Sequence, residues 1–211
     1  LPRNILAEKS FYKINETTKS YKKNYNIKAK ATVINKSINL INKSKKFVII
    51  VGAGIKYNSS FKTVTKLAEY LNVPIVTAAG HGDAIPNDHK LNSGQMGPRG
   101  NPVATNLMKE ADTILALGTR LGFNSTFYSY ENINKKAKII QVELEKKMIG
   151  KYFPVKIGIL ADASIVATQL LKALKQKKIL SNTEKWTKKF ISDRKKFLVN
   201  RDKIKSNNNP I

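Results

Sequence analysis

The sequence predicts an α/β fold in which a parallel sheet of about six strands carries helices on both faces. Short apolar runs such as residues 47–51 (FVIIV) are typical of strands that are buried on both sides. Stretches with apolar residues at helical spacing separate these runs, and several runs end at glycine. Strands that alternate with helices at this rhythm form parallel βαβ units.

Five of the strands can be assigned to particular residues. They are residues 47–51, 73–77, 112–117, 138–142 and 155–159. The first ends at Gly52-Ala53-Gly54 and the third at Gly118, where glycine permits a sharp turn. Between the second and third strands we expect a long loop that contains glycine and proline, from residue 79 to residue 100.

Helices are predicted before the first strand, between the first three strands and after the last strand. They cover about residues 29–44, 59–72, 102–111, 162–175 and 182–203. In the first of them, Ala31, Ile34, Ile38 and Ile41 fall on one face. Asp162 is expected to cap the fourth helix. The last helix is rich in lysine and carries three aromatic residues, which are Trp186, Phe190 and Phe197.

The net charge of +25 lies mainly outside the middle of the chain. Residues 1–46 carry 12 Lys and Arg against 2 acids, and residues 122–211 carry 20 against 7, whereas residues 47–121 carry 7 against 5. Only five of the 39 cationic residues are arginine, which is the side chain that reads bases with paired hydrogen bonds. We therefore expect solvated lysines and no nucleic-acid function.

Composition also bears on the compartment. The chain has no cysteine, so it forms neither disulfides nor thiolate metal sites, which suits the cytoplasm. No stretch approaches the ~20 apolar residues that a membrane span requires. The chain opens with Leu1-Pro2-Arg3 and has no secretory signal pattern. We expect a cytoplasmic protein without membrane contact.

Glycine-rich turns at strand ends are candidate binding sites, because ligands of parallel sheets bind where strands end and helices begin. Such turns are Gly52-Ala53-Gly54, residues 94–100, residues 118–122 and Ala161-Asp162-Ala163. Arg99 and Arg120 lie in two of them, and a guanidinium there could bind a diphosphate or a carboxylate. Taken alone, these residues slightly favour the alternative that the glycines only permit tight turns and the arginines tie loops together.

The dinucleotide-binding fingerprint is incomplete. After Gly52 and Gly54, Tyr57 occupies the position of the third glycine. Val76-Thr77-Ala78 stands at the end of the second strand, where an acid would bind the ribose. A conventional NAD-dependent dehydrogenase is therefore not expected.

Catalytic and metal-binding patterns are also absent. His81 and His89 share a loop with Asp83 and Asp88, but a spacing of eight without a third strong ligand is more typical of loop hydrogen bonding. No Gly-x-Ser-x-Gly pattern occurs. We assign no catalytic residue and no metal ligand.

Several strings, taken in order, resemble the central domain of the acetolactate synthase superfamily of thiamine diphosphate enzymes. They are 47–54 (FVIIVGAG), 94–100 (GQMGPRG), 111–122 (ADTILALGTRLG), 137–143 (AKIIQVE) and 158–163 (GILADA). The resemblance covers roughly residues 31–175 and implies the Rossmann-like fold of that domain.

Three further strings are most similar to the sulfoacetaldehyde acetyltransferase branch of the superfamily. They are 81–86 (HGDAIP), 117–122 (LGTRLG) and 147–150 (KMIG). The strings are nearly as similar to acetolactate synthase, and oxalyl-CoA decarboxylase and glyoxylate carboligase stay open as alternatives. The resemblance implies an enzyme that transfers or ligates acyl groups and acts on a small oxoacid or aldehyde.

The resemblance also implies a domain organisation. Residues 1–28 would be a linker from an N-terminal pyrimidine-binding domain, 29–176 the central α/β domain, and 177–211 a helical linker to a C-terminal diphosphate-binding domain. Those two outer domains would hold thiamine diphosphate and magnesium, because Gly82-Asp83-Ala84 lacks the second glycine of the family's Gly-Asp-Gly…Asn-Asn motif. This chain alone is therefore expected to be inactive.

The central domain of the family binds FAD in acetolactate synthase and a nucleotide or CoA portion in oxalyl-CoA decarboxylase, and it is vacant in others. The family's flavin-contacting positions correspond here to Gly52, Gly54, Gly94, Gly97, Arg120, Glu143 and Asp162. Ala161 replaces the usual glycine before Asp162, and Gly122-Phe123-Asn124 replaces the Asp-Asp-Arg run after Arg120. These departures favour a vacant scaffold with subunit contacts over FAD binding.

The resemblance further implies a homo-oligomer, either a dimer or a tetramer, because the family builds its active sites between subunits. Two alternatives come from other classes of protein. One is a stand-alone nucleotide-binding module, and the other is a basic nucleic-acid-binding protein, which the nearly neutral middle of the chain disfavours.

Overall fold

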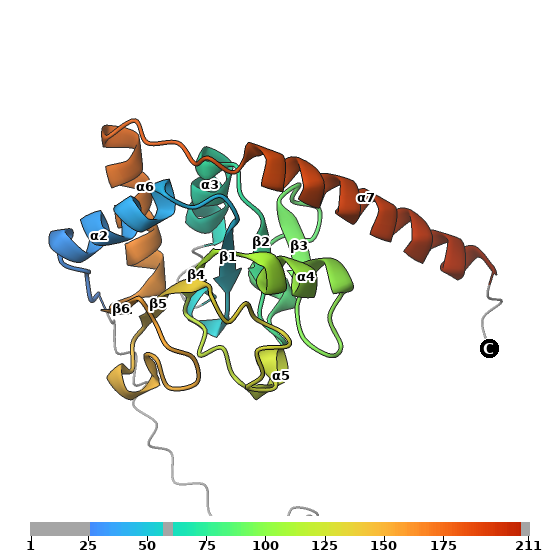
Figure 1. Cartoon of the computed structure of the whole chain (residues 1–211), viewed down its shortest axis with the longest axis horizontal. Helices are drawn as coiled ribbons and strands as arrows, with labels where there is room; N and C mark the ends of the chain where they lie inside the picture. The colour runs from blue at the N-terminus through green and yellow to red at the C-terminus, as the bar shows by residue number, and fades with distance from the viewer. Residues whose placement is uncertain (1–25, 57–60, 208–211) are drawn as a thin grey trace, which may run out of the picture.

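The computed structural model describes residues 26–56 and 61–207. Its centre is a parallel sheet with the strand order β3-β2-β1-β4-β5-β6 (Figure 1). The strands are β1 (Phe47–Val51), β2 (Ile75–Thr77), β3 (Asn92–Gln95), β4 (Thr113–Leu117), β5 (Lys138–Glu143) and β6 (Ile157–Leu160). The predicted linker at residues 1–28 lies almost entirely outside the described residues.

The central strands are buried along their whole length. Every residue of β1 and β4 is buried, and the two strands pair in parallel from Phe47 beside Thr113 to Val51 beside Leu117. A strand that is covered on both faces gains from apolar side chains at every position, which explains the uninterrupted run FVIIV. All five predicted strands are confirmed, and so is the α/β class.

The sixth strand, β3, lies inside the predicted long loop. Its sequence, Asn-Ser-Gly-Gln, is polar, so a search for apolar runs misses it. Hydrogen bonds hold it at the edge of the sheet: Ile75 N donates to Leu91 O, Met96 N donates to Thr77 O, and Ser93 Oγ donates to Ile75 O. Hydrogen bonds from loop backbone and side chains thus hold β3 on the sheet, although its sequence shows no hydrophobic pattern.

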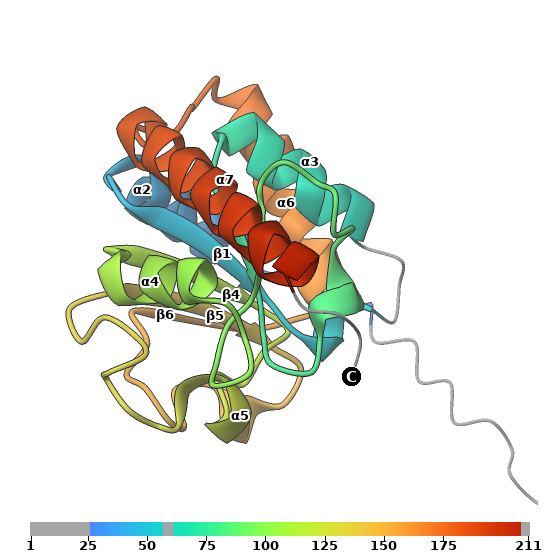
Figure 2. The ribbon, with the colours of Figure 1, turned by 90° about the vertical axis from the view of Figure 1, so that its right-hand side faces the viewer.

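Helices cover both faces, as predicted. Figure 2 shows α2, α3 and α6 on one side of the sheet and α4 on the other. The helices are α2 (Ala31–Asn42), α3 (Phe61–Leu71), α4 (Pro102–Glu110), α5 (Phe123–Thr126), α6 (Ala163–Gln176) and α7 (Glu184–Asn207). Short 3₁₀ turns are η1 (Ala53–Ile55), η2 (Gly82–Ala84) and η3 (Lys146–Met148). The short helix α5 is the one that the sequence pattern did not indicate.

Two helices begin at side-chain caps. The Asp162 carboxylate accepts hydrogen bonds from Ser164 N at 2.8 Å and Ile165 N at 3.1 Å, which confirms the predicted cap. Asn101 caps α4 through Ala104 N at 2.8 Å. Its amide nitrogen donates to Ser93 O at 2.7 Å, which joins the start of α4 to β3.

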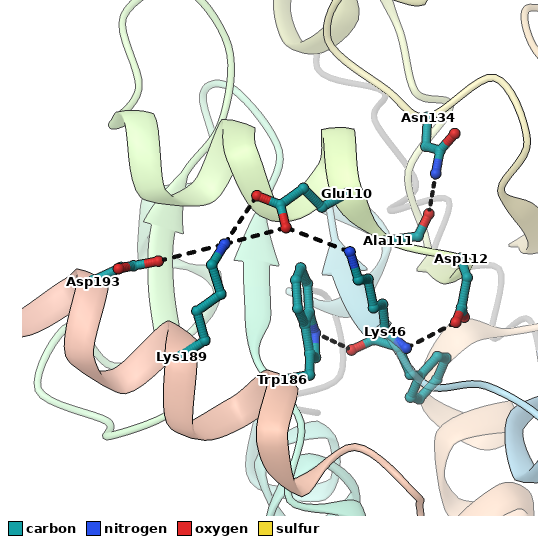
Figure 3. A network of polar contacts seen from close by, with 9 residues as sticks. Lys46, Glu110, Ala111, Asp112, Asn134, Trp186, Lys189 and Asp193 are labelled. Atoms are coloured by element: carbon teal, nitrogen blue, oxygen red, sulfur yellow. Dashed lines mark hydrogen bonds and ion pairs between the residues drawn. The ribbon is translucent and has the colours of Figure 1, made fainter.

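The first turns of α7 pack onto the amino-terminal edge of the sheet. Trp186 and Phe190 are buried in the same core as the sheet, and Trp186 Nε1 donates to Phe47 O at 3.1 Å. Figure 3 shows Lys189 and Lys46 on either side of this indole, both paired with Glu110 at 3.0 and 3.6 Å. The rest of α7 extends beyond the sheet (Figure 1). The core thus continues past residue 176, while the predicted linker role of 177–211 stays a prediction.

Among the helices that the structure describes, none combines the length and apolar character needed to cross a membrane.

Candidate functional site

A cleft of about 890 Å³ opens at the carboxyl ends of the central strands. The chain leaves β1 toward β2 on one side and leaves β4 toward β5 on the other, so the strand order reverses between β1 and β4. Ligands of open α/β sheets bind at this reversal. The cleft is lined by Ala53, Gly54, Ala78, Ala79, His81, residues 118–120, residues 122–125, Tyr128 and residues 143–145. Its volume is within the range of small-molecule sites.

Two glycines form the floor of the cleft and pack directly on each other. A Cβ on Gly54 would lie 2.6 Å from Gly118 Cα, and a Cβ on Gly118 would lie 2.5 Å from Gly54 Cα. Gly54 N also donates to Gly118 O at 3.0 Å. Gly52 lies beneath them, since a Cβ there would be 2.6 Å from Gly118 O. These glycines allow the turns after β1 and β4 to touch.

One wall of the cleft carries charge. Arg120 Nη2 contacts Glu145 Oε2 at 3.2 Å, and Lys147 Nζ contacts Glu145 Oε1 at 2.9 Å. The hydrogen bond from Lys147, with the charges of Lys147 and Arg120, lowers the pKa of Glu145 below its ordinary value. Glu143 accepts a hydrogen bond from Leu144 N at 3.0 Å. The wall therefore holds two acidic side chains, Glu143 and Glu145, beside Arg120.

His81 faces the cleft from the loop after β2. Its Nδ1 is buried and has no hydrogen-bond partner. Burial lowers the pKa of His81, the nearby Lys56 charge lowers it further, and Asp83 opposes the shift. Lys56 Nζ lies 2.5 Å from the Asp83 carboxylate. The lowered pKa favours the neutral imidazole, whose buried Nδ1 is left without a hydrogen-bond partner among the described residues.

Aromatic side chains form the outer wall. Phe123 and Tyr128 line the cleft, and the ring of Tyr128 stacks on that of Tyr152 at 4.3 Å between centroids. Ser125 Oγ accepts a hydrogen bond from Ala79 N at 3.0 Å, which ties α5 to the turn after β2. An apolar surface beside polar groups is the usual composition of a small-molecule site.

The structure brings together only part of the predicted site. Gly54, Arg120 and Glu143 line the cleft, and Gly52 lies beneath it. Gly97 packs against α5, with Asn124 O 2.5 Å from the position of a Cβ, and Gly94 packs against Asn101. Both have positive φ, 87° at Gly94 and 99° at Gly97. Asp162 is buried as the cap of α6. Ligand binding by the seven predicted flavin-contacting residues stays a prediction.

Sequence reasoning missed several residues of the cleft. Ser125, Tyr128 and Glu145 are not indicated by the sequence, because they lie in a one-turn helix and in irregular segments after β4 and β5 that are too short for a periodic pattern. His81 was read as a loop residue. The one available signal was position, since each of these residues follows the carboxyl end of a predicted strand.

The described residues do not fit magnesium-bound thiamine diphosphate. Among them, no group of three or more His, Asp or Glu side chains is arranged to hold a metal ion. Gly82-Asp83-Ala84 forms a 3₁₀ turn, and its aspartate is exposed and paired with Lys56. Because the diphosphate of such a cofactor needs a cation held by carboxylates, no catalytic step is assigned to these residues.

The sheet and its helices match a known family. The model of the thiamine pyrophosphate enzyme central domain matches residues 34–170, which run from α2 to α6 and exceed half of the chain. The chain belongs to this family. The central-domain resemblance seen in the sequence is therefore confirmed, together with its fold.

Similar proteins are longer enzymes. The sulfoacetaldehyde acetyltransferase of Roseovarius nubinhibens is 37% identical over 143 residues, which make up 67% of this chain and 24% of the relative. A probable sulfoacetaldehyde acetyltransferase of Rhizobium meliloti is 39% identical over 137 residues, 64% of this chain and 23% of the relative. A probable acetolactate synthase large subunit of Methanococcus aeolicus is 29% identical over 141 residues, 67% of this chain and 23% of the relative.

The matched part of this central domain thus spans about a quarter of the length of these relatives. The family implies thiamine diphosphate as the cofactor of the enzymes to which such domains belong.

Proposed function

We propose that this central domain serves in a thiamine diphosphate-dependent enzyme that transfers an acetyl group and acts on sulfoacetaldehyde. One observation carries the proposal. Over nearly the same residues, identity is 33–39% to the sulfoacetaldehyde acetyltransferases and 29–31% to the acetolactate synthase large subunits. Magnesium, a cytoplasmic location and assembly into a dimer or tetramer belong to the same proposal.

The test is an assay of the full-length protein that contains this domain, supplied with thiamine diphosphate and Mg²⁺. We expect it to consume sulfoacetaldehyde and to form no acetolactate. Acetolactate formation without consumption of sulfoacetaldehyde would instead support the second candidate, an acetolactate synthase large subunit.

Within that enzyme, we propose that the central domain acts mainly as a scaffold. The floor of the cleft supports this role, because Gly54 and Gly118 pack backbone against backbone, and this contact by itself explains why both are glycine. Arg120 is already paired with Glu145, and Glu143 adds a second carboxylate beside it. Carboxylates at this wall disfavour an anionic ligand.

FAD binding is the second candidate for the cleft, favoured by its volume and by its position at the reversal of strand order. Titration of flavin fluorescence with the purified chain tests it. The scaffold proposal expects no quenching. Saturable quenching that weakens at least about tenfold in Arg120→Ala, and is unchanged in Arg99→Ala outside the cleft, would establish the flavin site instead.

A further inference from the structure

Beside the cleft, the segment after β4 exposes four large aromatic side chains. Phe123, Phe127, Tyr128 and Tyr130 are exposed by 52%, 44%, 48% and 44%. We call these four residues the aromatic patch. A cluster of this kind is unusual on the surface of a soluble domain and marks a site of interaction.

Three rings of the patch contact one another, and two of the four contact the segment after β5. Phe123 touches Phe127 edge-on at 5.0 Å and lies 5.6 Å from Tyr128. Tyr128 stacks on Tyr152, and Tyr130 packs against the buried Phe153 at 5.4 Å. Phe123, Phe127 and Tyr128 therefore form one cluster, and Tyr130 is anchored separately on Phe153, the residue after Tyr152.

The backbone beneath the patch is strained. Phe127 and Tyr128 are consecutive and both adopt left-handed φ angles, 51° and 55°, which non-glycine residues other than asparagine and aspartate rarely take. Thr126 holds them there, since its Oγ1 accepts from Tyr128 N at 3.1 Å and donates to Leu121 O at 3.0 Å.

This combination is costly for the domain on its own. Asparagine at position 127 would adopt the left-handed angle more easily and would expose no ring to water. Strain of this kind persists where it serves binding. Burial of the rings by a partner would offset the cost of exposing them.

Two lysines lie beside the patch and its base. Lys135 Nζ lies 5.9 Å from the ring of Tyr130, and Lys151 Nζ lies 5.3 Å from that of Tyr152. Arg120 and Lys147 are close by on the cleft side, and both contact Glu145. The pKa of Tyr152 is lowered, first by its hydrogen bond with Tyr128 and also by the charges of Lys151 and Arg120.

These charges distinguish between the candidate partners. A second copy of this chain would bring the same cations against the rim, and its net charge is +25. A nucleic acid would need free ring faces for its bases, and the stacked pair Tyr128–Tyr152 has already used two of them. A protein surface with an apolar centre and an acidic rim meets neither objection.

We propose that the aromatic patch is a docking surface for a protein segment in which apolar side chains are flanked by carboxylates. The segment covers the rings of Phe123, Phe127, Tyr128 and Tyr130, and its carboxylates pair with the lysines at the rim. Phe123 and Tyr128 also line the cleft, whereas Phe127 and Tyr130 do not, so the latter two residues test the patch apart from the cleft.

The experiment measures fluorescence anisotropy of a labelled peptide of about 16 residues, with leucines along one helical face and glutamates elsewhere. One matched peptide replaces leucine by serine, and another replaces glutamate by lysine. The full 211-residue chain should bind the first peptide at least about tenfold more tightly than either matched peptide.

Phe127→Asn and Tyr130→Ser test the patch without touching the cleft, because neither residue lines it. Each should weaken binding of the glutamate–leucine peptide about three- to tenfold. Phe127→Asn should leave the midpoint of thermal unfolding within about 2 °C or raise it, because the change relieves the left-handed strain. Leu180→Ser, at a side chain 64% exposed outside the patch, should bind as the wild type does.

Three results would overturn the proposal. If the leucine and serine peptides bound equally well, the binding would come from charge attraction alone and not from the rings. Unchanged binding of the glutamate–leucine peptide by Phe127→Asn would show the same. Tighter binding of oligodeoxythymidylate that Phe127→Asn abolishes would make the patch a nucleic-acid surface. Self-association in sedimentation that Phe127→Asn abolishes would make it an interface between two copies.

Discussion

Gly118 lies where the turns after β1 and β4 touch. Its φ is 59°, a left-handed angle, and a Cβ there would lie 2.5 Å from Gly54 Cα. The atoms that a methyl group would meet are backbone, so they cannot rotate away. Both the dihedral angle and the contact therefore require glycine.

We expect Gly118→Ala to lower the free energy of unfolding by about 2–4 kcal/mol, from the left-handed angle and the overpacking together. Urea unfolding followed by the fluorescence of the single Trp measures the loss. Gly80→Ala separates the two causes, because Gly80 also has positive φ but has no atom within 4 Å of a Cβ. Gly122 has neither a positive φ nor an atom within 4 Å of a Cβ, so Gly122→Ala should leave the free energy of unfolding unchanged. Equal losses at all three positions would contradict this account.

Asp112 joins the residues before β1 to the start of β4. Its carboxylate accepts hydrogen bonds from the amides of Lys45 and Lys46, each at 2.9 Å, and from Ser44 Oγ. Burial acts to raise the pKa of Asp112, but these hydrogen bonds outweigh it and hold the pKa below its ordinary value.

Asp112→Asn should lower the free energy of unfolding by about 1–3 kcal/mol at pH 7. Because the pKa is depressed in the folded state, the carboxylate stabilises the fold above its unfolded pKa of about 3.9 and loses that effect as pH falls through the folded value. The difference between wild type and variant should therefore shrink below about pH 4. Urea unfolding at pH 7, 5 and 3 checks this, and a difference that is constant with pH would refute it.

At the scale of elements, α7 combines a buried start with an exposed continuation. Trp186 is buried, its indole donates to Phe47 O, and Lys46 and Lys189 lie 5.6 and 5.9 Å from its ring (Figure 3). Val199, 13 residues later in the same helix, is 47% exposed. The ion pairs of Glu110 are partly exposed, so each contributes little, and the indole should account for most of the attachment.

Trp186→Ala should cost about 3–5 kcal/mol of unfolding free energy, since it opens a cavity and leaves the Phe47 carbonyl without its donor. Val199→Ala, in the same helix, should stay within about 0.5 kcal/mol of wild type. Circular dichroism during urea unfolding reports both variants without relying on the tryptophan. Similar losses in the two variants would show that α7 is not anchored at Trp186.

At the scale of the whole molecule, the domain holds one cleft at the strand reversal and no metal-binding cluster among the residues that the structure describes. We expect the 211-residue chain alone to show no turnover of sulfoacetaldehyde or of oxoacids when thiamine diphosphate and Mg²⁺ are added. The full-length protein is the positive control. Turnover by the chain alone would show that its own residues hold the cofactor.

The sequence by itself determined the fold class, five of the six strands, the two covered faces and the family. These features follow from apolar runs, helical spacing and glycine positions, which are local in the chain. The cap at Asp162 was predictable for the same reason, because a cap depends on residues two or three positions away.

Only the tertiary structure decided the rest. The polar strand β3 exists because β2 and the Asn92 and Asn101 side chains supply its hydrogen bonds. Gly54 and Gly118 are 64 positions apart in the sequence, and only the pairing of β1 with β4 brings them into contact. Likewise, no local pattern shows that Phe127 and Tyr128 point outward on a strained turn. The physical reason is that pairing across a sheet and exposure at a surface depend on contacts between residues that the chain order does not encode locally.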